Sequence, residues 1–129
     1  MGSAPLPKVL IIDDEPSVRG MLRRMLPAGE YEMTEAVDGQ QALACLRAES
    51  FDVVLSDICM PGLSGVELLR QIREIDKDLP VILVTGNPDL VTATEAVALR
   101  AFRYMAKPPL REELRDAVQR AANLRRKST

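Results

Sequence analysis

The sequence predicts an α/β fold, with helices covering both faces of a five-stranded parallel sheet. Short apolar segments alternate five times with segments whose apolar residues recur at helical spacing. Several apolar segments are almost uninterrupted, as in strands that are buried on both faces. The length of 129 residues fits a single domain. Such alternation implies right-handed crossovers and, for five strands, the doubly wound order 2-1-3-4-5.

Five segments are expected to form the strands. Residues 8–12, 52–56 and 80–84 are rich in valine, leucine and isoleucine, which indicates buried strands. Residues 31–36 alternate polar and apolar side chains and predict a more exposed strand. Residues 102–105 form the short fifth strand.

A helix is expected after each strand. Pro16 suits the first position of a helix, Asp38 suits an N-cap, and Ser64 with Glu67 forms a capping box. Apolar residues at helical spacing continue from each of these starts. The expected helices cover residues 16–26, 39–49, 65–75, 90–99 and 110–124.

The domain is expected to occupy residues 8–124. We interpret residues 1–7 as a disordered lead-in or a cloning remnant. Residues 125–129 are interpreted as a basic tail or the start of a linker, because Arg125, Arg126 and Lys127 are consecutive cations. An effector domain beyond Thr129 is left open.

Composition excludes several classes of function. The chain contains no histidine and two cysteines, so it holds neither a Ser-His-Asp nor a Cys-His catalytic group. It also lacks the ligands of an ordinary zinc site and the cysteines of a disulfide framework. Two thiols suit a reducing compartment, and we expect a cytoplasmic protein.

The net charge of −2 does not indicate direct nucleic-acid binding. No apolar run has the length of a membrane helix.

Polar residues stand where the predicted strands end. Asp13 and Asp14 follow the first strand, Asp57 the third, Thr85 the fourth and Lys107 the fifth. Parallel strands bring these ends to one edge of the sheet, where three carboxylates repel one another unless a cation joins them. Oxygen ligands without histidine or cysteine favour a hard ion, Mg²⁺ or Mn²⁺. Because a carboxylate is also a nucleophile, this pattern indicates phosphoryl transfer to aspartate, with the cation and the lysine balancing phosphoryl charge.

These residues resemble the response-regulator receiver domain, a flavodoxin-like fold of two-component signalling. The resemblance covers residues 8 to about 124 and rests on four segments, which are Asp13-Asp14, Asp57-Ile58-Cys59-Met60-Pro61-Gly62, Thr85-Gly86 and Tyr104-Met105-Ala106-Lys107-Pro108. Each segment is common by itself, but the set in this order is specific.

The resemblance implies a role for each matched residue. Asp57 accepts a phosphoryl group from a phosphohistidine. Asp14, Asp57 and the Cys59 carbonyl bind Mg²⁺, and Asp13 acts largely through water. Lys107 and Thr85 contact the phosphoryl group, and Tyr104 switches between outward and inward rotamers. A cis peptide bond between Lys107 and Pro108 is also expected.

The resemblance further implies a signalling switch rather than an enzyme with a separate substrate. Because the chain has no histidine, the donor histidine must belong to another protein or to another part of a longer one, and the resemblance implies a sensor histidine kinase or a histidine phosphotransfer protein. The fourth helix, fifth strand and fifth helix form the switched surface, and a homodimer through that surface is left open. The family often has glycine where this chain has Arg100, and we expect the loop there to adjust so that arginine avoids a positive φ.

Two alternatives use the same fold. A phosphate-independent interaction module would be expected to lack an acid or the lysine, and neither is missing. A flavin protein would need a hydroxyl-rich and glycine-rich loop after the first strand. A haloacid-dehalogenase-type phosphatase would need an Asp-x-Asp-x-Thr run there, and the chain has Asp13-Asp14-Glu15 instead.

Overall fold

The computed structural model describes residues 5–127. Residues 1–4 of the expected lead-in and residues 128–129 of the expected tail lie outside this range. Five parallel strands form one sheet in the order β2-β1-β3-β4-β5, which confirms the predicted topology. The strands are β1 (Lys8–Ile12), β2 (Glu32–Ala36), β3 (Val53–Asp57), β4 (Val81–Thr85) and β5 (Arg103–Ala106).

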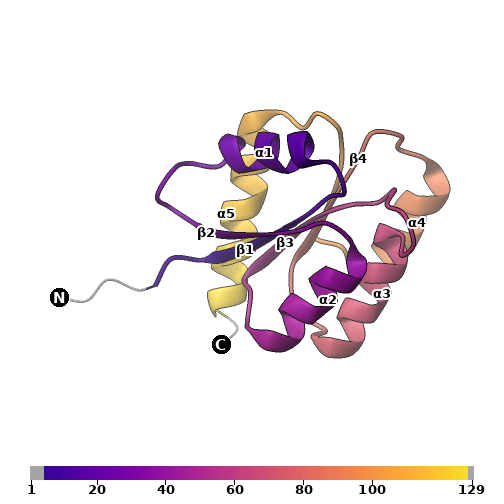
Figure 1. Ribbon diagram of the computed structural model, residues 1–129, viewed down its shortest axis with the longest axis horizontal. Coiled ribbons are helices and arrows are strands. Elements are labelled where there is room, and N and C mark those ends of the chain that lie inside the picture. Colours follow the sequence, from indigo (N-terminus) through magenta and orange to yellow (C-terminus); the bar gives the residue numbers. More distant parts are fainter. Residues whose placement is uncertain (1–4, 128–129) are drawn as a thin grey trace.

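Helices cover both faces of the sheet, as Figure 1 shows. They are α1 (Pro16–Met25), α2 (Gly39–Ala48), α3 (Gly65–Ile75), α4 (Leu90–Ala98) and α5 (Arg111–Lys127). Each has the expected place in the chain, with ends that differ by a few residues. The predicted caps are present, because Asp38 accepts the Gln41 amide and Ser64 accepts the Glu67 amide.

The sheet separates two apolar cores. Alternate residues of β1 point to opposite faces, so Val9 and Ile11 join the core under α1 and α5. Leu10 and Ile12 join the core under α2, α3 and α4. All four side chains are fully buried. This double burial explains why β1 reads as an almost unbroken apolar run.

Two loop and terminal features differ from expectation. Helix α5 continues to Lys127, so Arg125, Arg126 and Lys127 extend the helix rather than begin a tail. The expectation for Arg100 is wrong, because its φ is 61° and the arginine occupies the left-handed region. Its amide donates to the Val97 carbonyl at 2.9 Å, and the Ala101 amide donates to the Ala96 carbonyl. This tight end of α4 imposes the positive φ.

The Lys107–Pro108 peptide bond is cis, as expected. Among residues 5–127, no helix combines the length and the apolar character that a membrane span requires.

Candidate functional site

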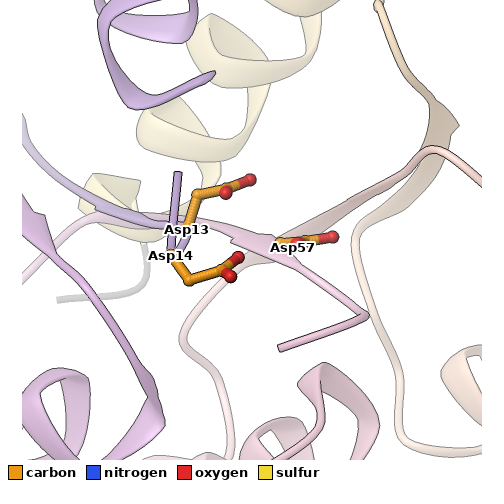
Figure 2. Close-up of side chains that lie close together, drawn as sticks. All are labelled: Asp13, Asp14 and Asp57. Carbon is orange, nitrogen blue, oxygen red and sulfur yellow. The ribbon is translucent and has the colours of Figure 1, made fainter. Parts of the chain in front are cut away.

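Three carboxylates gather at the carboxyl edge of the sheet. Asp13 and Asp14 directly follow β1, and Asp57 is the last residue of β3. Ligand oxygens of the three side chains lie within 4.8 Å of one another. Figure 2 shows the three side chains projecting in the same direction from neighbouring strand ends. Asp13 and Asp57 are buried, whereas Asp14 is exposed, so the cluster is open to solvent on one side.

Lys107 joins this cluster from the end of β5. Its Nζ lies 2.8 Å from Asp13 Oδ2 and 3.2 Å from Asp57 Oδ1. The Lys107 amide donates to the Thr85 carbonyl at 2.7 Å, which fixes the backbone beside the end of β4. The lysine therefore bridges the two buried acids. One ammonium faces three carboxylates.

The negative charges of the three aspartates in the site exceed the positive charge of Lys107. Burial raises the pKa of Asp57, Lys107 lowers it, and Asp13 raises it again, with a net upward shift. Burial lowers the pKa of Lys107, but its hydrogen bonds and ion pairs with Asp13 and Asp57 outweigh burial and raise it. The lysine thus stays charged, while the pKa of Asp57 remains above its ordinary value. A divalent cation would relieve this repulsion, and the all-oxygen donor set fits Mg²⁺.

Arg19 of α1 binds the backbone of Asp13. Its Nη1 donates to the Asp13 carbonyl at 2.6 Å, and its Nε pairs with Glu35 of β2 at 2.9 Å. The Glu15 amide donates to Asp13 Oδ1 at 2.9 Å. These contacts fix both the backbone and the carboxylate of Asp13. Sequence reasoning missed Arg19, because an arginine on an amphipathic helix carries no signal of the carbonyl that it binds.

Gly65 sets the position of Asp57. It is the first residue of α3, and its amide donates to the Ile58 carbonyl at 2.7 Å. A Cβ at this position would overlap the Asp57 carbonyl oxygen and would lie 2.6 Å from Ile58 Cα. Only glycine allows α3 to begin this close to β3. The Cys59 amide also donates to Asp57 Oδ1 at 3.2 Å, while the Cys59 side chain is exposed.

Thr85 lies at the end of β4 and is buried. Its Oγ1 accepts the Asn87 amide at 3.1 Å. Sequence reasoning also missed Asn87 and Glu15, which line a surface depression over the cluster. Its walls are formed by Glu15, Val18, Asp57, Cys59, Gly86, Asn87 and Lys107.

Tyr104 is the predicted site residue that the structure places away from the acids. Its hydroxyl lies 2.8 Å from Thr92 Oγ1 and accepts the Asp89 amide at 3.2 Å. Both partners belong to the first turn or the N-cap of α4. Tyr104 therefore connects β5 to the start of α4.

Comparisons with known proteins agree with this arrangement. The family described as response regulator receiver domain matches residues 9–119. The chain is 41% identical over 119 residues to the C4-dicarboxylate transport transcriptional regulatory protein DctD of Pseudomonas aeruginosa, covering 92% of this chain and 26% of that protein. It is 35% identical to sporulation initiation phosphotransferase F of Bacillus subtilis, covering 88% and 91% of the two chains.

A solved structure supports the same relationship. The CheY-like response regulator receiver domain protein from Methanospirillum hungatei JF-1 superposes with a TM-score of 0.90 and 26% identity, covering 97% of this chain and 100% of that one. This chain spans about a quarter of the length of DctD. The chain belongs to the response regulator receiver domain family, whose members are switches of two-component signalling.

Proposed function

We propose that Asp57 accepts a phosphoryl group from a phosphohistidine of a sensor histidine kinase or a histidine phosphotransfer protein. One observation carries this proposal: the buried Asp57 carboxylate shares Lys107 with Asp13 beneath a depression that opens to solvent. Because this chain has no histidine, the donor must lie outside it.

In the proposed reaction, a carboxylate oxygen of Asp57 attacks phosphorus. An O–P bond forms as the N–P bond to the donor imidazole breaks, and the electron pair of that bond stays on the imidazole nitrogen, which takes up a proton. The Lys107 ammonium lies 3.2 Å from Oδ1 of the attacking Asp57 carboxylate, so it can transfer its hydrogen bond to a phosphoryl oxygen. The chain catalyses only its own phosphorylation and dephosphorylation in this proposal.

Asp13, Asp14, Asp57 and the Cys59 carbonyl are the groups that would hold Mg²⁺, with Asp13 acting largely through water. When bound, Mg²⁺ supplies positive charge against the phosphoryl oxygens. The supporting observation is the closeness of the three carboxylates, which only one ammonium offsets among residues 5–127.

Phosphorylation is proposed to alter the surface of α4, β5 and α5. Thr85 Oγ1 would leave the Asn87 amide to donate to a phosphoryl oxygen. Tyr104 would then move inward and release Thr92 and the Asp89 amide, so the start of α4 would lose its tie to β5. A coupling of about 1–3 kcal/mol would change partner affinity by roughly 5- to 150-fold.

The partners of the whole protein are also proposals. An effector domain beyond Thr129 is supported by the relative DctD, which is much longer than this chain and is named a transcriptional regulatory protein. A homodimer through α4, β5 and α5 is proposed as a further consequence of phosphorylation. A cytoplasmic location is supported by the two free thiols, Cys45 and Cys59.

The test uses acetyl phosphate and Mg²⁺ with intact-mass detection. The chain should gain one phosphoryl group, Asp57→Asn should gain none, and Asp78→Asn should behave like the unmodified chain. Asp78 is a suitable control because it is exposed and lies in the loop before β4. Labelling of Asp57→Asn would overturn the assignment of Asp57 as the acceptor. No labelling of the unmodified chain would overturn the proposal and favour a phosphate-independent interaction module.

A further inference from the structure

A depression on the face of α1 and α5 contains four arginines and no acidic residue. It is lined by Arg23, Arg24, Leu26, Ala28, Gly29, Tyr31, Met33, Arg111 and Arg115. Its arginines come from the last turns of α1 and the first turns of α5. The depression is therefore locally basic, although the net charge of the chain is −2.

These arginines are only partly neutralised within the molecule. Arg23 pairs with Glu35 at 3.2 Å, and Arg115 Nε donates to the Met25 carbonyl at 2.7 Å. Arg24 and Arg111 are exposed, and their side chains form no ion pair or hydrogen bond with residues 5–127. Other cations of residues 5–127 differ, because Arg125, for example, pairs directly with the Asp76 carboxylate.

The floor of the depression is apolar and aromatic. Leu26 is buried, and Tyr31 and Met33 are half-buried. Burial and the nearby charge of Glu30 raise the pKa of Tyr31, so its phenol stays neutral. Arginine, tyrosine and methionine are the residues enriched at protein interfaces, and a guanidinium binds a carboxylate through two parallel hydrogen bonds.

We propose that this depression binds an acidic segment of a partner protein, in which carboxylates meet Arg24, Arg111 and Arg115 and an apolar side chain meets Tyr31 and Met33. Charge complementarity specifies the acidic character of the partner. The open, shallow shape of the surface suits an extended segment better than an enclosed small molecule. The surface lies outside the cluster of Asp13, Asp14 and Asp57, and the proposal does not depend on phosphorylation.

The test measures binding of a fluorescein-labelled peptide of alternating glutamate and leucine by fluorescence anisotropy. The double variant Arg24→Glu/Arg111→Glu should bind at least about tenfold more weakly, because both exposed guanidiniums become repulsive. Arg47→Glu/Lys77→Glu is the matched control. It changes net charge equally at exposed positions on α2 and in the loop after α3, and it should retain binding.

Circular dichroism checks that both variants are folded, and binding should weaken as salt rises. Equal loss in the two double variants would show a non-specific charge effect and overturn the proposal. So would no peptide binding to the unmodified chain. Tighter binding of pyrophosphate, or of phosphatidylserine vesicles, with the same dependence on Arg24 and Arg111 would replace the acidic segment with a phosphate ligand or a membrane surface.

Discussion

Charged side chains lie at both ends of the parallel strands, which we call the amino edge and the carboxyl edge of the sheet. Only at the amino edge do these charged side chains have enough partners of opposite charge or enough hydrogen-bond partners. At the amino edge, both terminal nitrogens of Arg125 bind the Asp76 carboxylate. Arg73 of α3 donates to the carbonyls of Leu79, Leu99 and Arg100. At the carboxyl edge, Asp13 and Asp57 share the ammonium of Lys107, and Asp14 lies beside them without an ion pair to it.

Two aspartates show the consequence of this difference. Burial raises the pKa of Asp76, but the hydrogen bond from Arg125 and backbone amides outweigh burial, and the net shift is downward. The pKa of Asp57 shifts upward, because burial and the neighbouring Asp13 outweigh Lys107. A carboxylate supplied with enough donors stabilises the fold. A cluster of carboxylates with too few donors would be stabilised by an added cation.

The largest expected effect comes from removing the cation at the carboxyl edge. Lys107→Ala leaves Asp13 and Asp57 without their shared ammonium, so phosphorylation by acetyl phosphate should slow by about 100-fold or more. Time-resolved intact mass measures the rate. Arg125→Ala is the matched change at the amino edge, and it should lower stability while leaving the rate unchanged. Equal rates in the two variants would contradict the difference between the edges.

Gly65→Ala tests how closely α3 must approach Asp57. The added Cβ overlaps the Asp57 carbonyl, so the variant should lose about 1–3 kcal/mol of unfolding free energy and phosphorylate more slowly. Urea denaturation measures the stability. Gly20→Ala in α1 is the control, because its Cβ meets only the flexible end of Arg24 and helical alanine is favourable. If Gly65→Ala changed neither the unfolding free energy nor the phosphorylation rate, the close approach of α3 to Asp57 would be unimportant.

Asp76→Asn tests the Arg125–Asp76 ion pair at the amino edge of the sheet. Removing the charge that Arg125 binds should cost about 1–2 kcal/mol near neutral pH, while phosphorylation of Asp57 is retained. Because the folded pKa of Asp76 is depressed, its contribution is complete above its unfolded pKa of about 4. The contribution is lost as pH falls through the folded pKa.

Urea midpoints measured from neutral to acidic pH should therefore converge for the unmodified chain and Asp76→Asn. A stability difference that does not shrink as pH falls below the unfolded pKa of about 4 would exclude this ion pair as the cause.

The smallest expected effect is at Tyr104. Tyr104→Phe removes a hydroxyl bonded to Thr92 and to the Asp89 amide, so it should destabilise the start of α4 by about 0.5–1.5 kcal/mol. Faster amide exchange at Leu90 to Ala93 would report this. Tyr31→Phe is the control, because the Tyr31 hydroxyl has no hydrogen-bond partner among residues 5–127. Equal amide-exchange rates at α4 in both variants would show that the Tyr104 hydroxyl does not stabilise the start of α4.

The sequence predicted the strand order and the convergence of Asp13, Asp57 and Lys107, because parallel strands place these ends at one edge whatever the details of packing. It did not reveal Gly65 or Arg19. Both act through close contacts with backbone carbonyls, which leave no periodic pattern. The expectation for Arg100 failed because the hydrogen bonds that end α4, from the Arg100 and Ala101 amides to the Val97 and Ala96 carbonyls, override the preference of arginine for negative φ.

The central claim is that Asp57, rather than another acid of the cluster, takes the phosphoryl group. The direct measurement is borohydride reduction of the phosphorylated chain followed by peptide mass spectrometry, which converts an aspartyl phosphate to homoserine. The account predicts homoserine at position 57 and intact aspartate at positions 13, 14 and 76. Homoserine at position 13 or 14, or at the balanced Asp76, would contradict it.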